Sequence, residues 1–240
     1  MRNPEGKALT VKNMFDRIAG RYDLMNSIAS LRMDKLWRRR AARECSVLPG
    51  ASCLDVCTGT GMLALELADS IRPGGRVVGV DFSRNMLAIA RERVKNLGFE
   101  NTVELVEGDA LSLPFNDDTF DCVTLAFCLR HFESIEEAVK EMVRVAKPGG
   151  RIVILEFSRP STPLYNMIYR FYLDRIVPML GKAITGDVEA YWYLADSIKD
   201  FPVREELKAV MEKTGLKNVE YYELSMGSIA IHRGIKRLEL

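Results

Sequence analysis

The sequence is short of the residues that build metal centres and disulfide frameworks. It contains two histidines and five cysteines among 240 residues, and the cysteines show no C-x-x-C spacing. A Cys/His metal cluster is therefore not expected. The cysteines fall mostly in apolar, strand-like runs, so they are most simply reduced core residues of a cytoplasmic protein.

The sequence also lacks an excess of one charge and a long hydrophobic run. Its 34 basic and 33 acidic residues leave a formal net charge of +1, so no global field attracts nucleic acid. Residues 1–7 lack the apolar core of a signal peptide, and no uncharged apolar stretch is long enough to span a bilayer. A chain of 240 residues that is 48% hydrophobic predicts one globular domain, residues 1–240.

Strand-like and helix-like segments alternate through the middle of the chain. Strands are predicted near residues 52–57, 76–81, 103–107, 119–126 and 150–156. The helices between them are predicted near residues 61–69, 83–97 and 134–146, and the last ends at a Pro-Gly-Gly turn at 148–150. This alternation predicts an α/β fold with a parallel sheet covered on both faces.

The remaining segments flank this core, residues 50–158. Residues 1–48 are predicted to be helical, because apolar residues recur three and four apart over 12–30. Residues 160–200 are predicted to form a helical insertion. Residues 203–240 are predicted to close the domain with a helix and two strands.

Residues 52–61, SCLDVCTGTG, form the most informative segment. A short apolar strand contains Asp55 and opens through Gly59 and Gly61 into a helix. Glycines permit a sharp turn and the close approach of a ligand, and the amides of the helix N-terminus favour an electron-rich group. The segment therefore predicts a site for a nucleotide-like cofactor.

Two cofactors are consistent with this turn. Gly59, Gly61 and Ala64 fit the dinucleotide pattern G-x-G-x-x-G/A, and Asp81 lies about 20 residues further on, which is typical of NAD sites. However, Asp55 stands where such sites usually have glycine, and a third strand is followed by Asp109. Three carboxylates at neighbouring strand ends suit the amino group, ribose and adenine of S-adenosylmethionine better.

Several further motifs extend over nearly the whole chain. They are YDLMN at 22–26, RVAKPGG at 144–150 running into EFS at 156–158, AYWYL at 190–194 and GSIAIHRG at 227–234. In these motifs the chain resembles the class I S-adenosylmethionine-dependent methyltransferases, and specifically the C-methyltransferases of ubiquinone and menaquinone biosynthesis (UbiE/MenG-like). The resemblance implies a Rossmann-like sheet of seven mostly parallel strands with the last antiparallel.

The resemblance also implies a reaction. It is methylation of a ring carbon of a polyprenylated quinol, either demethylmenaquinol or a ubiquinol precursor. Another small hydrophobic acceptor, or a cofactor-binding scaffold without activity in quinone synthesis, are the alternatives. Whether the protein forms a homodimer is left open.

Each expected cofactor contact has a structural alternative. Asp55, with Thr58, Gly59 and Gly61, is expected at the amino end of the cofactor, unless its carboxylate caps the following helix. Asp81 is expected to bind both ribose hydroxyls, although it or Ser83 could instead cap a helix. The adenine contacts are expected from Phe82, Met86, Asp109 and Ala110. Core packing at Met86 and a turn at Asp109 are the alternatives there.

The catalytic residues are expected after the fourth strand. Arg130 matches the arginine of the family and would stabilise a phenolate, but it cannot be a base at ordinary pH. A water or His131 must therefore take the proton; the family commonly has asparagine at this position, and His131 could instead cap the helix near Ser134. Tyr22 from the N-terminal lid would close over the quinol, unless it is a core residue.

The insertion is expected to bind the substrate tail. Apolar residues between 164 and 180 predict either a helix packed on the sheet or a channel for a polyprenyl chain. Tyr191, Tyr193 and Phe201 would provide aromatic walls. Besides His131, the chain departs from the family pattern at three further positions: Cys57 and Arg32 replace glycines, and Asp34 replaces a histidine.

A basic run in the N-terminal segment has two interpretations. It comprises Arg32, Lys35, Arg38, Arg39, Arg40 and Arg43 around Trp37. A solvated helix face is the simpler interpretation. The functional one is peripheral contact with an anionic membrane surface, because basic residues beside a tryptophan suit that interface. A nucleic-acid partner is not expected, since the run is short.

Overall fold

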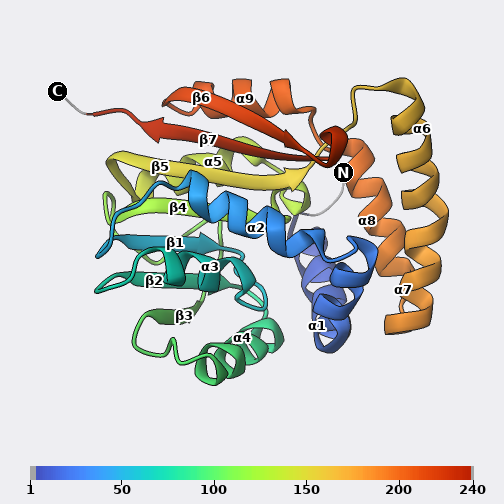
Figure 1. The fold of residues 1–240 in the computed structure, drawn as a ribbon, viewed down its shortest axis with the longest axis horizontal. Coiled ribbons are helices and arrows are strands. Elements are labelled where there is room, and N and C mark those ends of the chain that lie inside the picture. The colour runs from blue at the N-terminus through green and yellow to red at the C-terminus, as the bar shows by residue number, and fades with distance from the viewer. Residues whose placement is uncertain (1–3, 239–240) are drawn as a thin grey trace.

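A seven-stranded sheet forms the centre of the molecule (Figure 1). The computed structural model describes residues 4–238; residues 1–3 of the predicted lid and 239–240 of the closing segment lie outside this range. The strands are β1 (Ser52–Val56), β2 (Arg76–Asp81), β3 (Val103–Glu107), β4 (Phe120–Ala126), β5 (Ala146–Phe157), β6 (Leu216–Leu224) and β7 (Ile229–Lys236). Their order is β3-β2-β1-β4-β5-β7-β6. The last strand, β7, runs antiparallel to both of its neighbours, β5 and β6, and the other neighbouring strands are parallel, which confirms the predicted fold.

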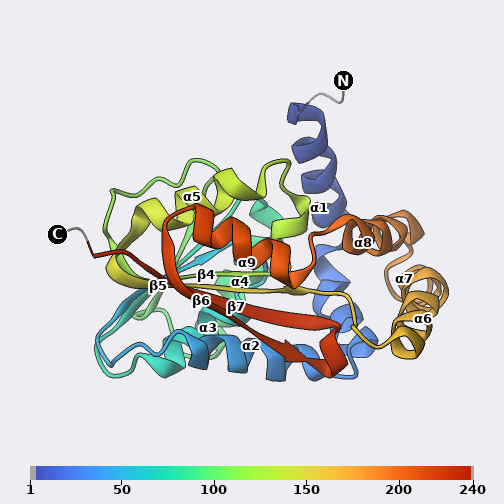
Figure 2. The same cartoon turned by 90° about the horizontal axis from the view of Figure 1, so that it is seen from above.

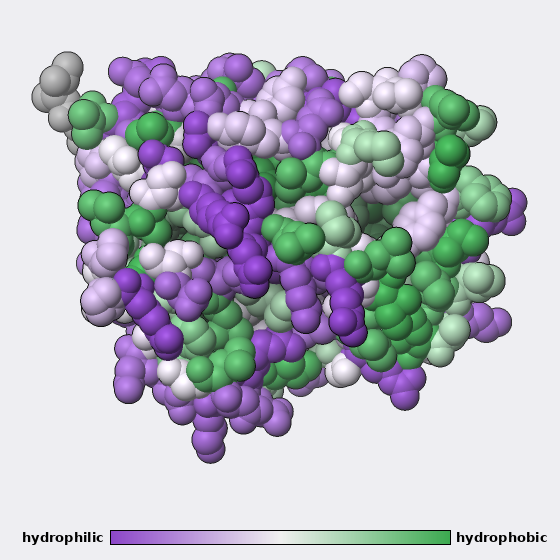
Figure 3. All heavy atoms as spheres, in the orientation of Figure 1, coloured by the Kyte–Doolittle hydropathy of each residue, from purple (hydrophilic) through white to green (hydrophobic). Residues whose placement is uncertain are grey.

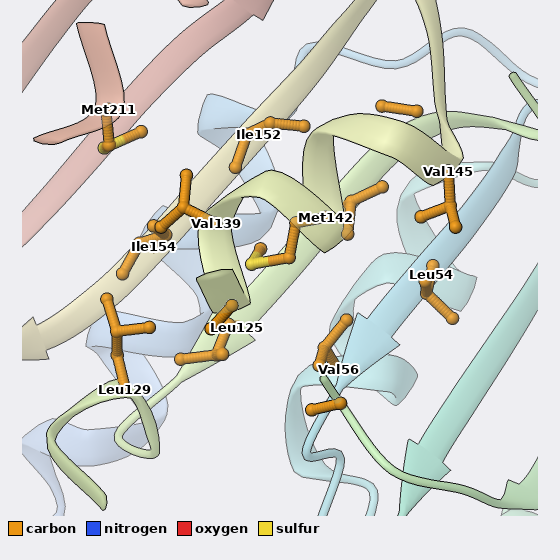
Figure 4. Close-up of a cluster of buried hydrophobic side chains, with 14 of the residues drawn as sticks. Leu54, Val56, Leu125, Leu129, Val139, Met142, Val145, Ile152, Ile154 and Met211 are labelled. Atoms are coloured by element: carbon orange, nitrogen blue, oxygen red, sulfur yellow. The ribbon is translucent and has the colours of Figure 1, made fainter. Parts of the chain in front are cut away.

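Helices cover both faces of the sheet (Figure 2). They are α1 (Pro4–Ala29), α2 (Met33–Glu44), α3 (Met62–Ser70), α4 (Arg84–Asn96), α5 (Ile135–Val145), α6 (Pro163–Phe171), α7 (Val177–Thr185), α8 (Val188–Asp200) and α9 (Arg204–Lys213). Because side chains alternate along a strand, Leu54 packs toward α5 and α9, whereas Cys53 packs toward α2 and α3. Figure 4 shows part of the first of these clusters, with the side chains of Val139, Met142 and Val145 on α5 beside the strands.

The Pro-Gly-Gly segment at 148–150 lies inside β5 and not before it. Phe120 of β4 pairs with Ala146, and Cys122, only two residues on, pairs with Arg151. The extra residues of β5 form a bulge, so the strand begins earlier than the sequence predicted. The preceding helix does end within one residue of its predicted position, at Val145.

The helical insertion and α1 lie together at the carboxyl ends of the parallel strands (Figure 1). They share a buried cluster that includes Met25 of α1, Leu173, and Tyr191 of α8. A π-helical turn (Tyr172–Ile176) joins α6 to α7. The predicted lid and the predicted insertion are therefore one structural unit beside the sheet edge where ligands bind in open α/β folds. Between residues 4 and 238, no helix is long and apolar enough to cross a membrane.

Gly181 of α7 determines how closely α7 and α8 approach. A Cβ atom at this position would lie 2.0 Å from Cδ2 of the buried Tyr191. We expect Gly181→Ala to lower the free energy of unfolding, measured by urea titration, because overpacking costs about 1–3 kcal/mol. Gly20→Ala is the control: a Cβ there meets nothing within 4 Å, so it should stabilise α1 by about 0.5–1 kcal/mol. Equal effects of both substitutions would contradict this packing.

Candidate functional site

The turn after β1 is fixed from inside by Asp55. This residue is 1% exposed, and its two carboxylate oxygens accept hydrogen bonds from the hydroxyls of Thr58 (2.7 Å) and Thr124 (2.8 Å). Burial raises the pKa of Asp55 to about 6, although these hydrogen bonds lower it. Asp55 is therefore directed into the protein, where it holds the loop in shape.

Three residues of this loop have positive φ. Gly59 has φ 55° and Gly61 has φ 79°, which glycine adopts without strain. Cys57 has φ 55°, in the left-handed region that the glycine expected from the family pattern would adopt without strain. A Cβ at Gly61 would lie 3.2 Å from Cβ of Ala90, so this glycine also lets α3 approach α4.

Asp81 connects two loops at the end of β2. One of its carboxylate oxygens accepts a hydrogen bond from the Gly59 amide (2.8 Å), and the other accepts one from the Ser83 amide (2.9 Å). Ser83 is the N-cap of α4, since its hydroxyl accepts from the amide of Met86. Asp81 is therefore not the cap of that helix. Burial raises its pKa, while the amide hydrogen bonds lower it.

A cavity of about 40 Å³ lies against Asp81. Of the predicted cofactor residues, Gly59, Asp81, Phe82 and Met86 line it. The other predicted cofactor residues, Asp55, Thr58, Gly61, Asp109 and Ala110, do not line it. Asp109 is exposed and accepts a hydrogen bond from the Leu111 amide (2.9 Å), so it forms the turn that the sequence left as its alternative role.

Helix α1 covers this small cavity. Phe15 and Tyr22 of α1 line the cavity. Asp23 accepts a hydrogen bond from the Thr60 hydroxyl (2.8 Å) and pairs with Arg93. Sequence reasoning missed this arrangement because α1 is some 40 residues from the glycine turn, and only packing brings the two together.

A second and much larger cavity of about 400 Å³ lies between α1, α2 and the helical insertion. All three predicted catalytic residues, Tyr22, Arg130 and His131, line it. Its other walls are mostly apolar and aromatic and include Tyr165, Ile168, Tyr169, Tyr172, Tyr191 and Tyr193. Tyr22, Phe15 and Phe127 line both cavities, so the two spaces meet at these side chains.

Arg130 is held by a buried carboxylate. It lies on the 3-10 turn Leu129–His131 that follows β4, and its Nη1 donates to Oε1 of Glu156 (2.8 Å) and to the carbonyl of Phe127. The side chains of Arg130 and Glu156 are 3% and 1% exposed. Burial raises the pKa of Glu156 and the attraction of Arg130 lowers it, with a net rise. Glu156 belongs to one of the family motifs in the sequence, but no function was expected for it there.

His131 contacts two aromatic residues. Its Nδ1 lies 3.1 Å from the hydroxyl of Tyr193, and the two rings stack with centroids 5.5 Å apart. Phe15 contacts the His131 ring edge-on at 5.3 Å. His131 is not the cap of the next helix, because the Ser134 hydroxyl has that role.

Two other expectations for this region are corrected by the structure. Phe201 does not line the cavity and is buried in the core formed with α9. Trp37 is also buried, where its Nε1 donates to the Ser225 hydroxyl (3.1 Å). Arg38 is buried in an ion pair with Asp34 (2.8 Å). Trp37 and Arg38 are therefore not at the surface, where the membrane interpretation of the basic run would place them.

Comparison with known proteins identifies close relatives. The model of the ubiE/COQ5 methyltransferase family matches residues 3–236. The chain is 42% identical over 230 residues to the ubiquinone/menaquinone biosynthesis C-methyltransferase UbiE of Pseudomonas fluorescens (strain SBW25). It is 43% identical to the UbiE protein of Pseudomonas syringae pv. syringae (strain B728a). Each match covers 96% of this chain and 90% of the relative.

Solved structures share the fold at lower sequence identity. A SAM-dependent methyltransferase from Aquifex aeolicus superposes with a TM-score of 0.64 at 19% identity, covering 89% of this chain and 97% of its own. The [4+2]-cyclase SpnF gives a TM-score of 0.70 at 18% identity, covering 95% of this chain and 96% of its own. These likenesses establish the fold alone.

The buried Asp55 predicts a pH dependence of stability. Its pKa is about 6 in the folded protein against an ordinary value of 3.8, so its contribution to the free energy of unfolding is complete below pH 4 and is lost as the pH rises through 6. At 1.36 kcal/mol per pKa unit this loss is about 3 kcal/mol. We expect Asp55→Asn to remove this loss of stability. Urea unfolding between pH 4 and pH 7 measures the free energy of unfolding of both proteins.

Asp121→Asn is the control for this measurement. Burial would raise the pKa of Asp121, but hydrogen bonds from Lys147 and the Ser52 amide lower it below 3.8, so its titration is complete before pH 5. This substitution should leave the slope of the free energy of unfolding against pH, between pH 5 and pH 7, unchanged. An Asp55→Asn protein with the same slope as the wild type would show that Asp55 is not the titrating group.

Proposed function

The chain belongs to the ubiE/COQ5 methyltransferase family, and on that basis we propose that it transfers a methyl group from S-adenosylmethionine to a ring carbon of a polyprenylated quinol. The quinol is demethylmenaquinol or a ubiquinol precursor, as the names of the relatives suggest. One observation carries the proposal: a small cavity beside the Asp81 carboxylate shares the side chains of Tyr22 and Phe127 with a large apolar cavity. A cofactor and a hydrophobic acceptor would thus face each other there.

The residues around the small cavity fit the cofactor. A Cβ at Gly59 would meet nothing within 4 Å, so the backbone is open to close approach. Asp81 offers a carboxylate for ribose hydroxyls, and Phe82 and Met86 offer apolar surfaces for the adenine. Asp55 acts in this proposal by bracing the loop with Thr58 and Gly61, and its link to the amino end is indirect.

Asp109 and Ala110 are proposed at the outer edge of the adenine, with the exposed Asp109 carboxylate toward its amine. The cavity of about 40 Å³ is far smaller than the roughly 300–1,000 Å³ of ordinary ligand pockets. We infer that helix α1 moves outward to admit the cofactor. Its contacts through Asp23 to Thr60 and Arg93 would break and form again with each exchange.

The large cavity suits a quinol with an apolar tail. When bound, S-adenosylmethionine supplies an electrophilic methyl group. The quinol becomes a carbon nucleophile when a hydroxyl loses its proton, and Arg130 would stabilise the phenolate. Tyr22 would hold the ring where the cavities meet, and such positioning contributes about 7–11 kcal/mol. His131 is one candidate for the base, and its contact with Tyr193 sets which ring nitrogen accepts a proton.

Methyl transfer to a short-chain demethylmenaquinol analogue tests the proposal. We expect turnover by the wild type and, for Asp81→Ala, loss of cofactor affinity of about 10-fold to 100-fold, since a hydrogen bond to a charged group contributes about 1.5–3 kcal/mol. Isothermal titration measures that affinity. Tight cofactor binding without turnover on any quinol would sink the proposal and favour the scaffold; turnover only on another small hydrophobic acceptor would favour that substrate.

We further propose that the protein contacts a membrane surface through α6. Leu164, Met167, Ile168 and Phe171 recur three and four apart, and each is more than half exposed. Figure 3 shows hydrophobic residues gathered on this side of the molecule. Ile168 and the exposed Leu31 also line the large cavity, so the apolar surface continues into the proposed tail site.

Basic residues accompany this apolar surface. Arg32, Lys35, Arg170 and Arg175 are exposed, and within residues 4–238 they form no ion pair. Such residues favour an anionic lipid surface. The exposed α6 side chains, and not the buried Trp37, would form the apolar part of the contact.

Sedimentation with vesicles that contain anionic phospholipid measures this contact. We expect the wild type to sediment with the vesicles and the double variant Met167→Ser/Phe171→Ser to bind at least about tenfold more weakly, because burying each side chain contributes about 1.5–3 kcal/mol. Leu97→Ser, at an equally exposed leucine beyond the end of α4, should bind like the wild type. Indistinguishable binding of the double variant would refute a role for α6.

A further inference from the structure

Two cysteines lie at the proposed cofactor site. Cys57 and Cys128 are only partly buried, whereas the other three cysteines of the chain are buried. Both residues line the small cavity that Asp81 also lines. This pair is therefore open to the cavity and is not enclosed in the core as the other three cysteines are.

Strand pairing brings these two thiols together. The strands β1 and β4 are parallel neighbours, and Val56 lies opposite Leu125. Cys57 follows β1 directly, and Cys128 lies two residues beyond the end of β4. The thiol of Cys57 is hydrogen-bonded to that of Cys128. Two segments that are far apart in the sequence thus place two sulfur atoms in contact at the wall of the cofactor cavity.

The same two strands carry a second pair of cysteines, which provides an internal reference. Cys53 and Cys122 lie opposite each other in the register of β1 and β4, and both are 0% exposed. Burial is the largest influence on the pKa of each thiol and raises it. A reagent dissolved in water reaches the cavity pair and does not reach this buried pair, because the reactivity of a cysteine depends on its exposure.

The size of the cavity selects the reagent. Its volume of about 40 Å³ admits molecules close to the size of water. Hydrogen peroxide meets this limit, whereas a bulky oxidant such as oxidised glutathione does not. Phe15 and Tyr22 of α1 also line the cavity, so α1 restricts access to the thiols in the same way as it restricts access for the cofactor.

We propose that Cys57 and Cys128 form a reversible disulfide on exposure to hydrogen peroxide, and that this disulfide weakens binding of S-adenosylmethionine. The effect on the cofactor rests on the proposed function, whereas formation of the disulfide does not. The pair would then be a redox switch at the cofactor site.

The reaction balances with peroxide as the only oxidant. One thiol loses its proton and its sulfur attacks an oxygen of the peroxide, so that the O–O bond breaks, a sulfenic acid forms and hydroxide takes up the proton to leave as water. The second sulfur then attacks the sulfenic sulfur. Its S–H bond and the S–O bond break, the S–S bond forms, and a second water leaves. The two thiols together lose two electrons, and the peroxide is reduced to two waters.

The new bond would displace the glycine turn. A disulfide requires about 2.05 Å between its sulfur atoms, which is shorter than a hydrogen-bond contact, so the segment with Cys57 must move toward β4. That segment continues into Gly59, whose amide donates to Asp81 at 2.8 Å. Binding groups have to stay within about 0.5 Å of their productive positions, so this displacement weakens cofactor binding. Bound cofactor would in turn cover the thiols and protect them.

The surroundings of the pair set its reactivity. The titratable neighbours come from four elements: Asp55 of β1, Asp81 of β2, Tyr22 of α1 and Tyr193 of α8. The hydrogen bond with Cys128 is the largest influence on the pKa of Cys57 and raises it, and burial and the two carboxylates raise it further. Burial raises the pKa of both tyrosines, which stay neutral. Because the thiolate attacks peroxide, oxidation should accelerate between pH 7 and pH 9.

Treatment of the reduced protein with hydrogen peroxide tests the proposal. Peptide mapping by mass spectrometry identifies any disulfide, and isothermal titration measures the affinity for S-adenosylmethionine before and after treatment. We expect a disulfide between Cys57 and Cys128 and a cofactor affinity at least about tenfold weaker, since misplacement by 1 Å has effects of this order. Dithiothreitol should restore the affinity, which it would not do if Met86 had been oxidised to the sulfoxide. Cofactor present during treatment should slow formation of the disulfide.

Single substitutions separate the pair from other effects of peroxide. Cys57→Gly, which suits a φ of 55°, and Cys128→Ser should each abolish the loss of affinity that dithiothreitol reverses. Cys53→Ala is the control and should keep the loss, because it removes a buried thiol away from the cavity. The wild-type measurements stand without these variants if one of them does not fold.

Two results would overturn the proposal. One is a peroxide-treated wild type in which peptide mapping finds Cys57 and Cys128 unlinked. The other is a fully linked protein that binds S-adenosylmethionine as tightly as the reduced protein does. A reduced wild type that does not bind S-adenosylmethionine would refute the proposed function instead, and the peptide map would still decide whether the two thiols react with each other.

Discussion

The buried pair of Arg130 and Glu156 is the constraint on which the proposed acceptor site depends. It joins the end of β4 to the end of β5 through a contact of 2.8 Å with almost no exposure to water. Breaking such a pair costs about 3–5 kcal/mol because the remaining charge is stranded. The 3-10 turn that carries His131 is therefore fixed relative to the sheet, and the guanidinium has one orientation toward the cavity.

The proposed cofactor site has three carboxylates, each in a different environment. Asp55 is enclosed and shapes the loop, Asp81 links two loops and still lines a cavity, and Asp109 is exposed in a turn. The same residue type thus supports bracing, binding and turn formation at neighbouring strand ends. Helix α1 completes the site from outside the sheet, and its contact with Arg93 makes access to the cofactor cavity depend on its position.

The sequence predicted a parallel sheet covered by helices and the positions of the acidic strand ends, because these follow from local patterns of alternation and glycine. It did not predict features that arise from packing between distant segments. Trp37 is buried because its indole meets Ser225, nearly 190 residues away. The importance of Glu156 follows from its contact with Arg130, which the sequence does not show. Helix α6 exposes its apolar stripe, since the adjacent tyrosines face the cavity.

The central claim is that the two cavities bring a sulfonium methyl group to a ring carbon of a quinol. The most direct measurement uses S-adenosylmethionine labelled with ¹³C in its methyl group and identifies the labelled position in the product by NMR. The account predicts a single labelled methyl group bonded to a ring carbon of the quinol. A label on a quinol oxygen, or a cofactor that remains unconsumed in the presence of quinol, would contradict it.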